Sequence, residues 1–288
     1  MKCTYYPGCS LHATGRAYDE STRAVAPALG IELVELPDWN CCGATAYMGV
    51  NELLAHSLTA RNLSLAKTAG LPVVAPCSAC YTNLKKTEKY LAEYPDLKAK
   101  VDQALAAGNL KYDGGVTTRH LLEAVVEDVG LDKVKAQVKK PLTGLKVAPY
   151  YGCQIVRPYG IHDDEHNPMM LDRLLTALGA TVVPYALKTM CCGGALMGTK
   201  EEVALVLCKN LLTCAKEAGA DCIAVTCPLC QMNVDMYQRR VNSAHGTDFA
   251  LPVLYFTQLM GAAFGLAGKE LGFGRIVQKP PAQLEARN

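Results

Sequence analysis

One cysteine pattern occurs twice in this chain, and no other feature of the sequence constrains the fold as strongly. Each copy has a single cysteine, an adjacent pair followed by glycine, and a Cys-x-x-Cys element, with 33 residues between that glycine and the last element in both copies. The first copy comprises Cys9, Cys41, Cys42, Cys77 and Cys80. The second comprises Cys153, Cys191, Cys192, Cys227 and Cys230, at an offset of 150 residues for the last four. We infer an internal duplication that folds as two similar units.

Strands and helices are expected to alternate in each half. The hydrophobic pattern predicts strands at 2–6, 31–36, 72–75, 145–150, 181–185 and 221–225. Helices are predicted near 15–29, 51–69, 169–178 and 200–218, with Asn167-Pro168 as the start signal of the third. Strands joined by helices form parallel sheets, whose functional loops lie at the carboxyl ends of the strands. Because every cysteine element follows a strand, we expect an α/β fold of two repeated, Rossmann-like, mainly parallel units with five thiols at one edge of each sheet.

The predicted domain boundaries follow the repeat. The first unit is placed at 1–94, a helical connection without a counterpart at 95–143, the second unit at 144–268 and a basic tail at 269–288. The uncharged stretch 249–268 is long enough to cross a bilayer, but it contains Pro252 and several glycines. We therefore interpret it as a short strand at 252–255 followed by a buried helix at 257–266, without a transmembrane span.

Fourteen cysteines are many for a chain that begins without a signal-peptide pattern. We expect a cytoplasmic location, where thiols stay reduced and clustered cysteines indicate metal or redox chemistry rather than disulfides. The formal net charge of +2 gives no reason to expect binding to nucleic acid. Four cysteines lie outside the two sets and are expected to be small buried side chains. They are Cys3, Cys208, Cys214 and Cys222.

The cysteine spacing favours a metal cluster. Soft thiolates select zinc, copper(I) or iron–sulfur clusters, and four thiols are the usual number for structural zinc or a cubane cluster. Each set here has five. Adjacent cysteines diverge and are better placed to reach neighbouring irons of a larger unit, with Gly43 and Gly193 permitting the turn. Helices predicted to begin just after Cys80 and Cys230 would direct their positive ends at the thiolates.

Other candidate residues carry weaker signals. The chain lacks the closely spaced cysteine run of bacterial ferredoxins, so redox-active clusters would take electrons from a partner protein. His12, three residues after Cys9, is a candidate proton donor for a departing thiolate, although a hydrogen-bonded loop histidine is the simpler interpretation. The charged run 162–166 is interpreted as a loop that caps the next helix rather than as a site for a hard metal ion.

The pattern resembles the CCG domain, and the tandem pair resembles the B-type subunit of heterodisulfide reductase. The resemblance rests on the ten cysteines and their glycines, on Lys188-Thr189-Met190 and on the segment 252–259, and it covers nearly the whole chain. In that family the five cysteines of each motif hold a noncubane 4Fe-4S cluster. The resemblance therefore implies two such clusters as cofactors, one on each set, with all ten cysteines as metal ligands. It also implies a ferredoxin-like iron–sulfur partner of the C type and a flavoprotein partner of the A type in a multi-subunit complex.

The activity implied by the resemblance is cleavage or formation of a small or protein-bound disulfide, an oxidoreductase reaction on a sulfur group. A second interpretation keeps the clusters without the substrate, as in the electron-transfer CCG subunits of flavin-dependent lactate- or succinate-type oxidoreductases. The residues also leave open zinc in one or both sites, or thioredoxin-like thiol sensors. The duplicated Cys-Cys-Gly argues against this third interpretation, because neither zinc sites nor such sensors need it.

Overall fold

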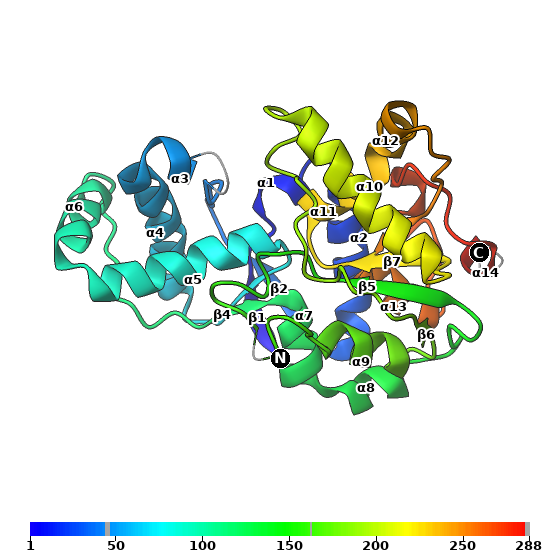
Figure 1. Ribbon diagram of the computed structural model, residues 1–288. Helices are drawn as coiled ribbons and strands as arrows, with labels where there is room; N and C mark the ends of the chain where they lie inside the picture. Colours follow the sequence, from blue (N-terminus) through cyan, green and yellow to red (C-terminus); the bar gives the residue numbers. More distant parts are fainter. Residues whose placement is uncertain (44–46, 162, 286–288) are drawn as a thin grey trace.

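Two parallel sheets of four strands organise the molecule. The computed structural model describes residues 1–43, 47–161 and 163–285. The first sheet contains β1 (Lys2–Tyr5), β2 (Glu32–Glu35), β3 (Val73–Ala75) and β4 (Thr118–His120). The second contains β5 (Lys146–Tyr150), β6 (Thr181–Val182), β7 (Cys222–Val225) and β8 (Val253–Tyr255). The strand orders are β2-β1-β3-β4 and β6-β5-β7-β8, so the two sheets have the same topology (Figure 1). The expected α/β fold with two repeated units is confirmed.

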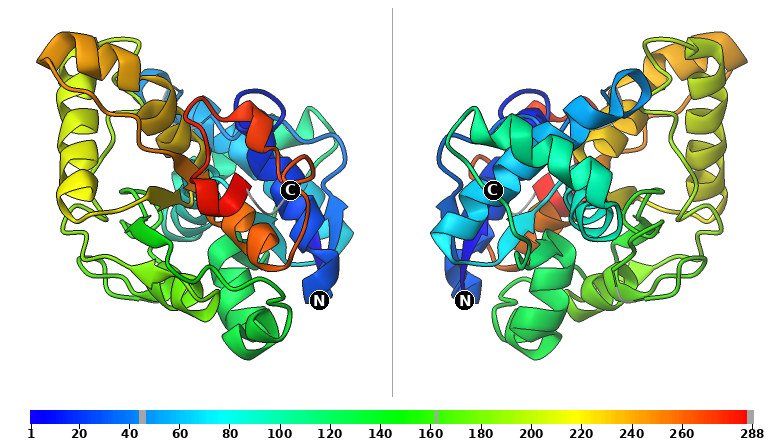
Figure 2. Two further views of the ribbon diagram at one scale, coloured as in Figure 1. Left: turned by 90° about the vertical axis from the view of Figure 1, so that its right-hand side faces the viewer. Right: turned by 90° about the vertical axis from the view of Figure 1, so that its left-hand side faces the viewer.

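Helices surround both sheets. In the first half they are α1 (Gly8–Leu11), α2 (Arg16–Val25), α3 (Tyr47–Val50), α4 (Glu52–Ala69), α5 (Ser78–Glu93), α6 (Pro95–Ala106), α7 (Leu121–Glu123) and α8 (Leu131–Ala136). In the second they are α9 (Met170–Ala177), α10 (Glu201–Glu217), α11 (Pro228–Gln231), α12 (Gln238–His245), α13 (Phe256–Ala263) and α14 (Ala282–Glu285). Figure 2 shows α10, in yellow, along one outer side of the molecule and the N-terminus on the other.

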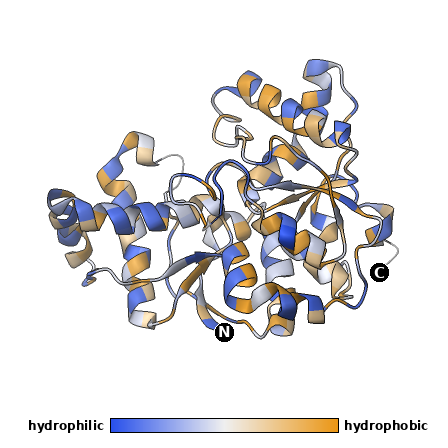
Figure 3. Ribbon diagram, turned by 60° about the horizontal axis from the view of Figure 1, so that its bottom comes forward, coloured by the Kyte–Doolittle hydropathy of each residue, from blue (hydrophilic) through white to orange (hydrophobic). Residues whose placement is uncertain are grey.

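Local sequence explains the start and end of these elements. Helix α4 begins after Asn51, whose side chain accepts the Leu54 N–H at 2.9 Å, and it ends at Gly70 with φ 68°. Every residue of β3 and β7 is buried, as expected for strands covered on both faces. In Figure 3 the helices carry alternating blue and orange segments, which is the pattern of elements with one face in the core.

The segment 95–143 differs from the expected helical connection because it contains β4. This strand pairs in parallel with β3 and completes the first sheet. It corresponds to β8 of the second sheet, since each of the two strands ends on a residue that caps the following helix. His120 forms a capping box with Glu123, and Tyr255 forms one with Gln258. The segment therefore belongs to the repeat and has a counterpart.

The two halves pack closely against each other. We call residues 1–140 the first lobe and residues 141–285 the second lobe. Two equivalent pairs of helices join them, α2 with α13 and α7 with α9. Between α2 and the end of β8, Tyr18 stacks on Tyr255 with ring centroids 4.2 Å apart. Ser21 and Thr257 share a buried hydroxyl hydrogen bond of 2.7 Å. These fully buried contacts fix the position of one sheet relative to the other.

The carboxyl-terminal part of the chain makes contacts with both lobes. The strand and buried helix predicted in 249–268 are present as β8 and α13, and no helix in the described ranges is long and apolar enough to cross a membrane. After α13, Arg275 pairs with Glu20 of the first lobe at 2.8 Å, and Leu284 is buried. The basic tail is thus packed onto the protein as far as it is described.

Asp235 makes the stability of this arrangement depend on pH. Its carboxylate accepts the N–H of Val277 in the tail at 2.7 Å, but burial raises its pKa from 3.8 to about 6. The folded chain then binds the proton more tightly than the unfolded chain. The contribution of Asp235 to stability is therefore greatest below its unfolded pKa and falls by up to about 3 kcal/mol as the pH rises through 6.

We expect Asp235→Asn to remove this pH slope. Urea denaturation of the full chain between about pH 4 and pH 7 measures it. Asp248→Asn is the matched control, because Asp248 lies at the surface beside Lys216, and the hydrogen bond from that lysine lowers its pKa instead. A variant at Asp235 with the slope of the unmodified protein would contradict the assignment.

Candidate metal centre

The five thiols of the first lobe form a row of neighbouring sulfurs. Cys9 follows β1 and Cys41 follows β2, and their Sγ atoms lie 3.6 Å apart at the surface. Cys42 and Cys80 are buried, with 3.4 Å between their Sγ atoms. Hydrogen bonds between Cys41 and Cys42 and between Cys77 and Cys80 connect these pairs. The structure thus brings together all five cysteines of the first set.

The second lobe repeats this arrangement. Cys153 and Cys191 are hydrogen-bond partners, and the Sγ atoms of Cys192 and Cys230 lie 3.7 Å apart. Cys230 also hydrogen-bonds to Cys227. All five thiols line one cavity of about 70 Å³. The second set therefore also converges on one place, at the carboxyl ends of β5 and β7.

The two rows of sulfurs meet at the boundary between the lobes. Cys77 and Cys227 are both buried, and their thiols are hydrogen-bond partners across this boundary. The cavity of the second set is also lined by Ser78 and Ala79 of the first lobe. The two cysteine sets consequently face each other through one shared space.

The helices after the last cysteine elements begin earlier than expected. Helix α5 starts at Ser78 and α11 starts at Pro228, so Cys77 and Cys227 occupy the N-cap positions. Cys80 and Cys230 lie within the first turn rather than before it. This geometry places both members of each Cys-x-x-Cys element on one face of a helix start, where the helix dipole stabilises negative charge.

Contacts between thiols lower the pKa of one surface cysteine in each set. Hydrogen bonds from Cys42 and Cys9 lower the pKa of Cys41, and a hydrogen bond from Cys153 lowers the pKa of Cys191 to about 6. The corresponding partners Cys9 and Cys153 have raised pKa values, first because of the same hydrogen bonds and then because of burial. The thiolate is the form that binds metal, so each Cys-Cys pair begins with a sulfur prepared for coordination.

The donor set fits iron–sulfur binding in both lobes. Across 1–43, 47–161 and 163–285, no three His, Cys, Asp or Glu side chains gather around one point as a single metal ion requires. The sulfurs instead follow one another in rows, which suits a unit of several irons better than one tetrahedral zinc. Gly43 and Gly193 have φ values of 71° and 73°, in the left-handed region that glycine adopts without strain.

A buried tyrosine holds the backbone just before each Cys-Cys pair. The Tyr6 hydroxyl donates to the carbonyl of Asn40 at 2.8 Å, and the Tyr150 hydroxyl donates to the carbonyl of Met190 at 2.8 Å. Both tyrosines are fully buried. They are visible in the sequence as repeated neighbours of the first cysteine in each set, but only the fold shows what they contact. They fix the backbone from which Cys41 and Cys191 project.

An asparagine supports the second cysteine of each pair, and sequence analysis missed it. Asn83 donates its side-chain N–H to the carbonyl of Cys42 at 2.9 Å, and Asn233 donates to the carbonyl of Cys192 at 2.6 Å. Both asparagines follow the last cysteine of their set by three residues. The 150-residue offset is the sequence signal that identifies them as a pair.

Tyr150→Phe is expected to destabilise the protein by about 1–2 kcal/mol, because the Met190 carbonyl loses its hydrogen-bond donor. Tyr6→Phe is the matched control and should cost less. The Asn40 carbonyl keeps a second donor, the side chain of Asn62 at 2.8 Å. Urea denaturation of the two variants compares them directly, and equal losses would show that the tyrosine hydroxyls do not act through these carbonyls.

His12 does not face the thiols. Its Nε2 lies 3.5 Å from Oε1 of Glu35, and its ring packs edge-on against Trp39 with 5.0 Å between centroids. Within the part of the chain that the structure describes, no contact between His12 and a cysteine is found. Its role as a proton donor stays a prediction.

The charged loop before α9 acts as a helix cap. The carboxylate of Asp163 accepts the N–H groups of Met169 and Met170, each at 2.7 Å. Helix α9 consequently begins at Met170, so the predicted start at Asn167-Pro168 is wrong by two residues. His162 of this loop lies outside the described residues.

Of the four remaining cysteines, Cys208 contacts a cysteine of the second set. Cys3, Cys208 and Cys222 are buried and Cys214 is half-buried. The Cys208 thiol donates to the carbonyl of Cys192 at 3.4 Å. In the first lobe the hydroxyl of Thr59 makes the same kind of contact to Cys42 at 2.9 Å. Cys208 is therefore part of the support of the second set rather than only a small core residue.

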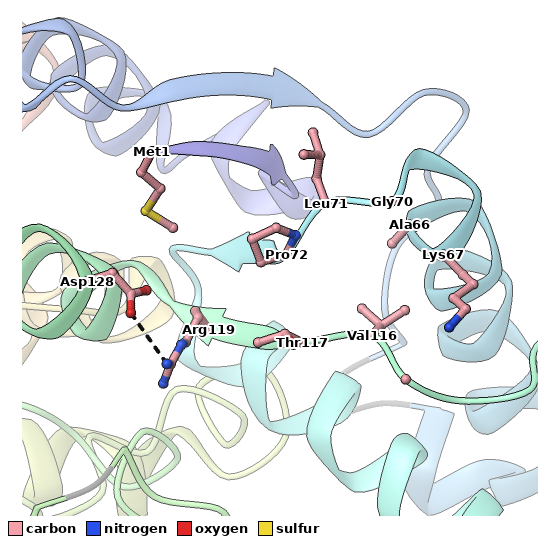
Figure 4. Close-up of a pocket in the computed structure, with 11 residues that line it drawn as sticks. Met1, Ala66, Lys67, Gly70, Leu71, Pro72, Val116, Thr117, Arg119 and Asp128 are labelled. Atoms are coloured by element: carbon pink, nitrogen blue, oxygen red, sulfur yellow. Dashed lines mark ion pairs between the residues drawn. The ribbon is translucent and has the colours of Figure 1, made fainter.

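A larger cavity lies at the opposite edge of the first sheet. It has a volume of about 600 Å³ and includes Met1, Pro72 and the ion pair of Arg119 with Asp128 at 3.4 Å (Figure 4). None of its lining residues carries a thiol. Both cysteine sets lie instead at the carboxyl edge of the strands.

Comparisons with known proteins agree with this geometry. The cysteine-rich CCG domain matches residues 3–85 and 147–235. The 8-methylmenaquinol:fumarate reductase membrane anchor subunit of Wolinella succinogenes is 36% identical over 276 residues, 95% of each chain. The B-type subunit of the ferredoxin/F420H2-dependent CoB-CoM heterodisulfide reductase of Methanosarcina acetivorans is 31% identical over 94% of this chain and 92% of that protein. A solved structure of a hypothetical protein from Helicobacter pylori has a TM-score of 0.77 at 16% identity, covering 96% of this chain and 52% of the other, and supports the fold alone.

Proposed function

The chain belongs to the family of tandem CCG-domain proteins that includes the B-type subunits of heterodisulfide reductase, and from this we propose that it cleaves or forms a disulfide within an iron–sulfur complex. Relatives that carry the name of this B-type subunit are parts of an oxidoreductase. The proposed cofactors are two noncubane 4Fe-4S clusters, with the ten cysteines of the two sets as ligands. The proposed partners are a ferredoxin-like iron–sulfur protein and a flavoprotein.

One observation carries this proposal. The two sets meet where Cys77 contacts Cys227, and the cavity of the second set is closed on one side by Ser78 and Ala79 of the first lobe. A disulfide needs two electrons and two protons to become two thiols, whereas an iron–sulfur cluster passes one electron at a time. Two clusters that face one space match that requirement, since each could serve one sulfur of the substrate.

The residues of the chain prepare the site for this reaction. Cys41 and Cys191 ionise readily and lie at the surface, whereas Cys77 and Cys227 are buried at the boundary between the lobes. The apolar side chain of Leu229 and the buried ring of Tyr151 line the cavity. Electrostatic interactions with a bound substrate would be stronger beside these apolar groups than in water. Clusters held by the ten cysteines would supply the electrons, and iron to bind the substrate sulfur.

A second candidate function is electron transfer without a disulfide substrate. The Wolinella succinogenes relative, at 36% identity, belongs to a fumarate reductase. In this role the same two clusters would pass electrons between a flavoprotein partner and a quinone-type donor. The shared space between the sets would then have no substrate of its own.

Reoxidation of the reduced protein distinguishes the two functions. The full chain, loaded with iron and sulfide under anaerobic conditions, is reduced with a viologen and mixed with small-molecule and protein-bound disulfides or with a naphthoquinone. We expect disulfides to reoxidise it and to yield two thiols for every two electrons consumed. Reoxidation by the quinone but by none of the disulfides would favour electron transfer and reject the proposed substrate.

A further inference from the structure

A buried histidine lies at the boundary between the two cysteine sets. His120 ends β4 and is fully buried. Its Nδ1 accepts the N–H of Leu122 at 3.1 Å, so the hydrogen of the neutral ring must be on Nε2. Burial lowers the pKa of His120 to about 4, and the ring is neutral at physiological pH. Nε2 is therefore a hydrogen-bond donor with a fixed direction.

The His120 ring contacts backbone of both lobes. The imidazole is in hydrogen-bonding contact with the backbone of Pro76 and of Thr226, and the hydroxyl of Ser78 lies 3.4 Å from Nε2. Pro76 and Thr226 are the residues immediately before Cys77 and Cys227. The hydroxyl of Tyr18 adds a second donor to the Thr226 carbonyl at 3.2 Å. One imidazole thus holds the two backbone segments from which the facing thiols project.

The equivalent position in the second lobe does not duplicate this contact. Tyr255 ends β8 as His120 ends β4, but its hydroxyl donates to the side chain of Gln231 at 3.3 Å. Its ring is occupied by the stack on Tyr18. The link between the two carbonyls therefore depends on His120, and the repeat supplies no substitute on the other side.

We propose that His120 is a positioning residue that sets the separation between Cys77 and Cys227 and thereby the spacing of the two cysteine sets. The proposal concerns the protein alone and is independent of which substrate or electron partner the complex uses. It can fail while the proposed function holds, and it can hold if that function fails.

Crosslinking of the metal-free full chain tests the proposal. Diamide oxidises two neighbouring thiols to a disulfide by taking two electrons and two protons. Mass spectrometry with peptide fragmentation quantifies the Cys77–Cys227 disulfide. The Cys9–Cys41 disulfide is the internal reference, because its thiols lie 3.6 Å apart within one lobe. The measured quantity is the ratio of the two products.

Two amide variants distinguish the two roles of the ring, which are to cap the helix and to contact the two carbonyls. His120→Asn keeps a side-chain acceptor for the Leu122 N–H and thus the helix cap, but its amide is too short to reach the carbonyls. We expect the ratio to fall about tenfold or more, since a shift of about 1 Å is enough to disrupt a reaction between fixed groups. His120→Gln carries an N–H near the position of Nε2 and should restore most of the ratio.

His56→Asn is the matched control. His56 is also fully buried in the first lobe, but its Nδ1 contacts Thr87 on α5, away from the lobe boundary. We expect its ratio to match that of the unmodified protein, with circular dichroism showing that each variant is folded. An unchanged ratio in His120→Asn, or an equal fall in His56→Asn, would overturn the proposal. Failure of His120→Gln to restore the ratio would overturn it as well.

Discussion

Cys230→Ser is expected to remove the second iron–sulfur unit and to abolish disulfide turnover while leaving the first unit in place. Cys230 is buried, lies 3.7 Å from Cys192 and hydrogen-bonds to Cys227, so its loss interrupts the row of sulfurs in the middle. The iron content should fall from about eight to about four atoms per chain. The activity should vanish rather than halve, because two-electron cleavage needs both sites.

The repeat provides the mirror variant and the control. Cys80→Ser should cause the same loss in the first lobe, since Cys80 lies 3.4 Å from Cys42. Cys3→Ser should leave iron and turnover unchanged, because Cys3 is buried outside both sets and its side chain can donate to the Glu32 carbonyl. Iron analysis and viologen-linked turnover measure all three variants. Half the turnover remaining in either ligand variant would show that one cluster is sufficient.

Gly8→Ala is expected to destabilise the first lobe and to displace the thiol of Cys80. Gly8 has a φ of 70°, and a Cβ at this position would lie 2.9 Å from Sγ of Cys80. Strain in the left-handed region and the steric overlap together should cost about 3 kcal/mol, a large part of the stability of a typical domain. Because the sulfur of Cys80 must move to relieve the overlap, iron should also be lost from the first lobe.

Gly70→Ala separates backbone strain from the contact with sulfur. Gly70 has nearly the same φ, 68°, but a Cβ there meets nothing within 4 Å. This control should cost about 1 kcal/mol and should retain all its iron. Gly152→Ala should repeat the effect in the second lobe, where the Cβ would lie 2.9 Å from Sγ of Cys230. Urea denaturation and iron analysis decide the matter, and equal losses at Gly8 and Gly70 would contradict a role in holding the thiol.

Much of the fold could be predicted because the repeat and the strand pattern agree. Cysteine elements that follow strands must meet at one edge of a parallel sheet, and this places the two sets from sequence alone. Strand β4 could not be found in this way. Thr118, Arg119 and His120 have no alternating apolar pattern, and they form a strand only because β3 offers its free edge. Tertiary pairing, not local propensity, determines this element.

For a similar reason, the sequence could not predict that the two cysteine sets face each other. Nothing within one repeat specifies that Cys77 should contact Cys227, since that contact arises from the packing of α2 on α13 and of α7 on α9. The contacts of His120 with both lobes arise in the same way. By contrast, the pairs Tyr6 with Tyr150 and Asn83 with Asn233 are present in the sequence as repeated residues. They could have been identified from the sequence by comparing the residues that flank equivalent cysteines in the two repeats.

The most direct test of the central claim is the metal and sulfide content of the anaerobically reconstituted full chain, measured together with Mössbauer spectroscopy. Two facing sets of five thiols predict about eight iron and about eight sulfide per chain, with irons in more than one environment within each cluster. A chain that binds zinc alone, or about four iron in a single cubane cluster, would contradict the claim that both sets hold clusters.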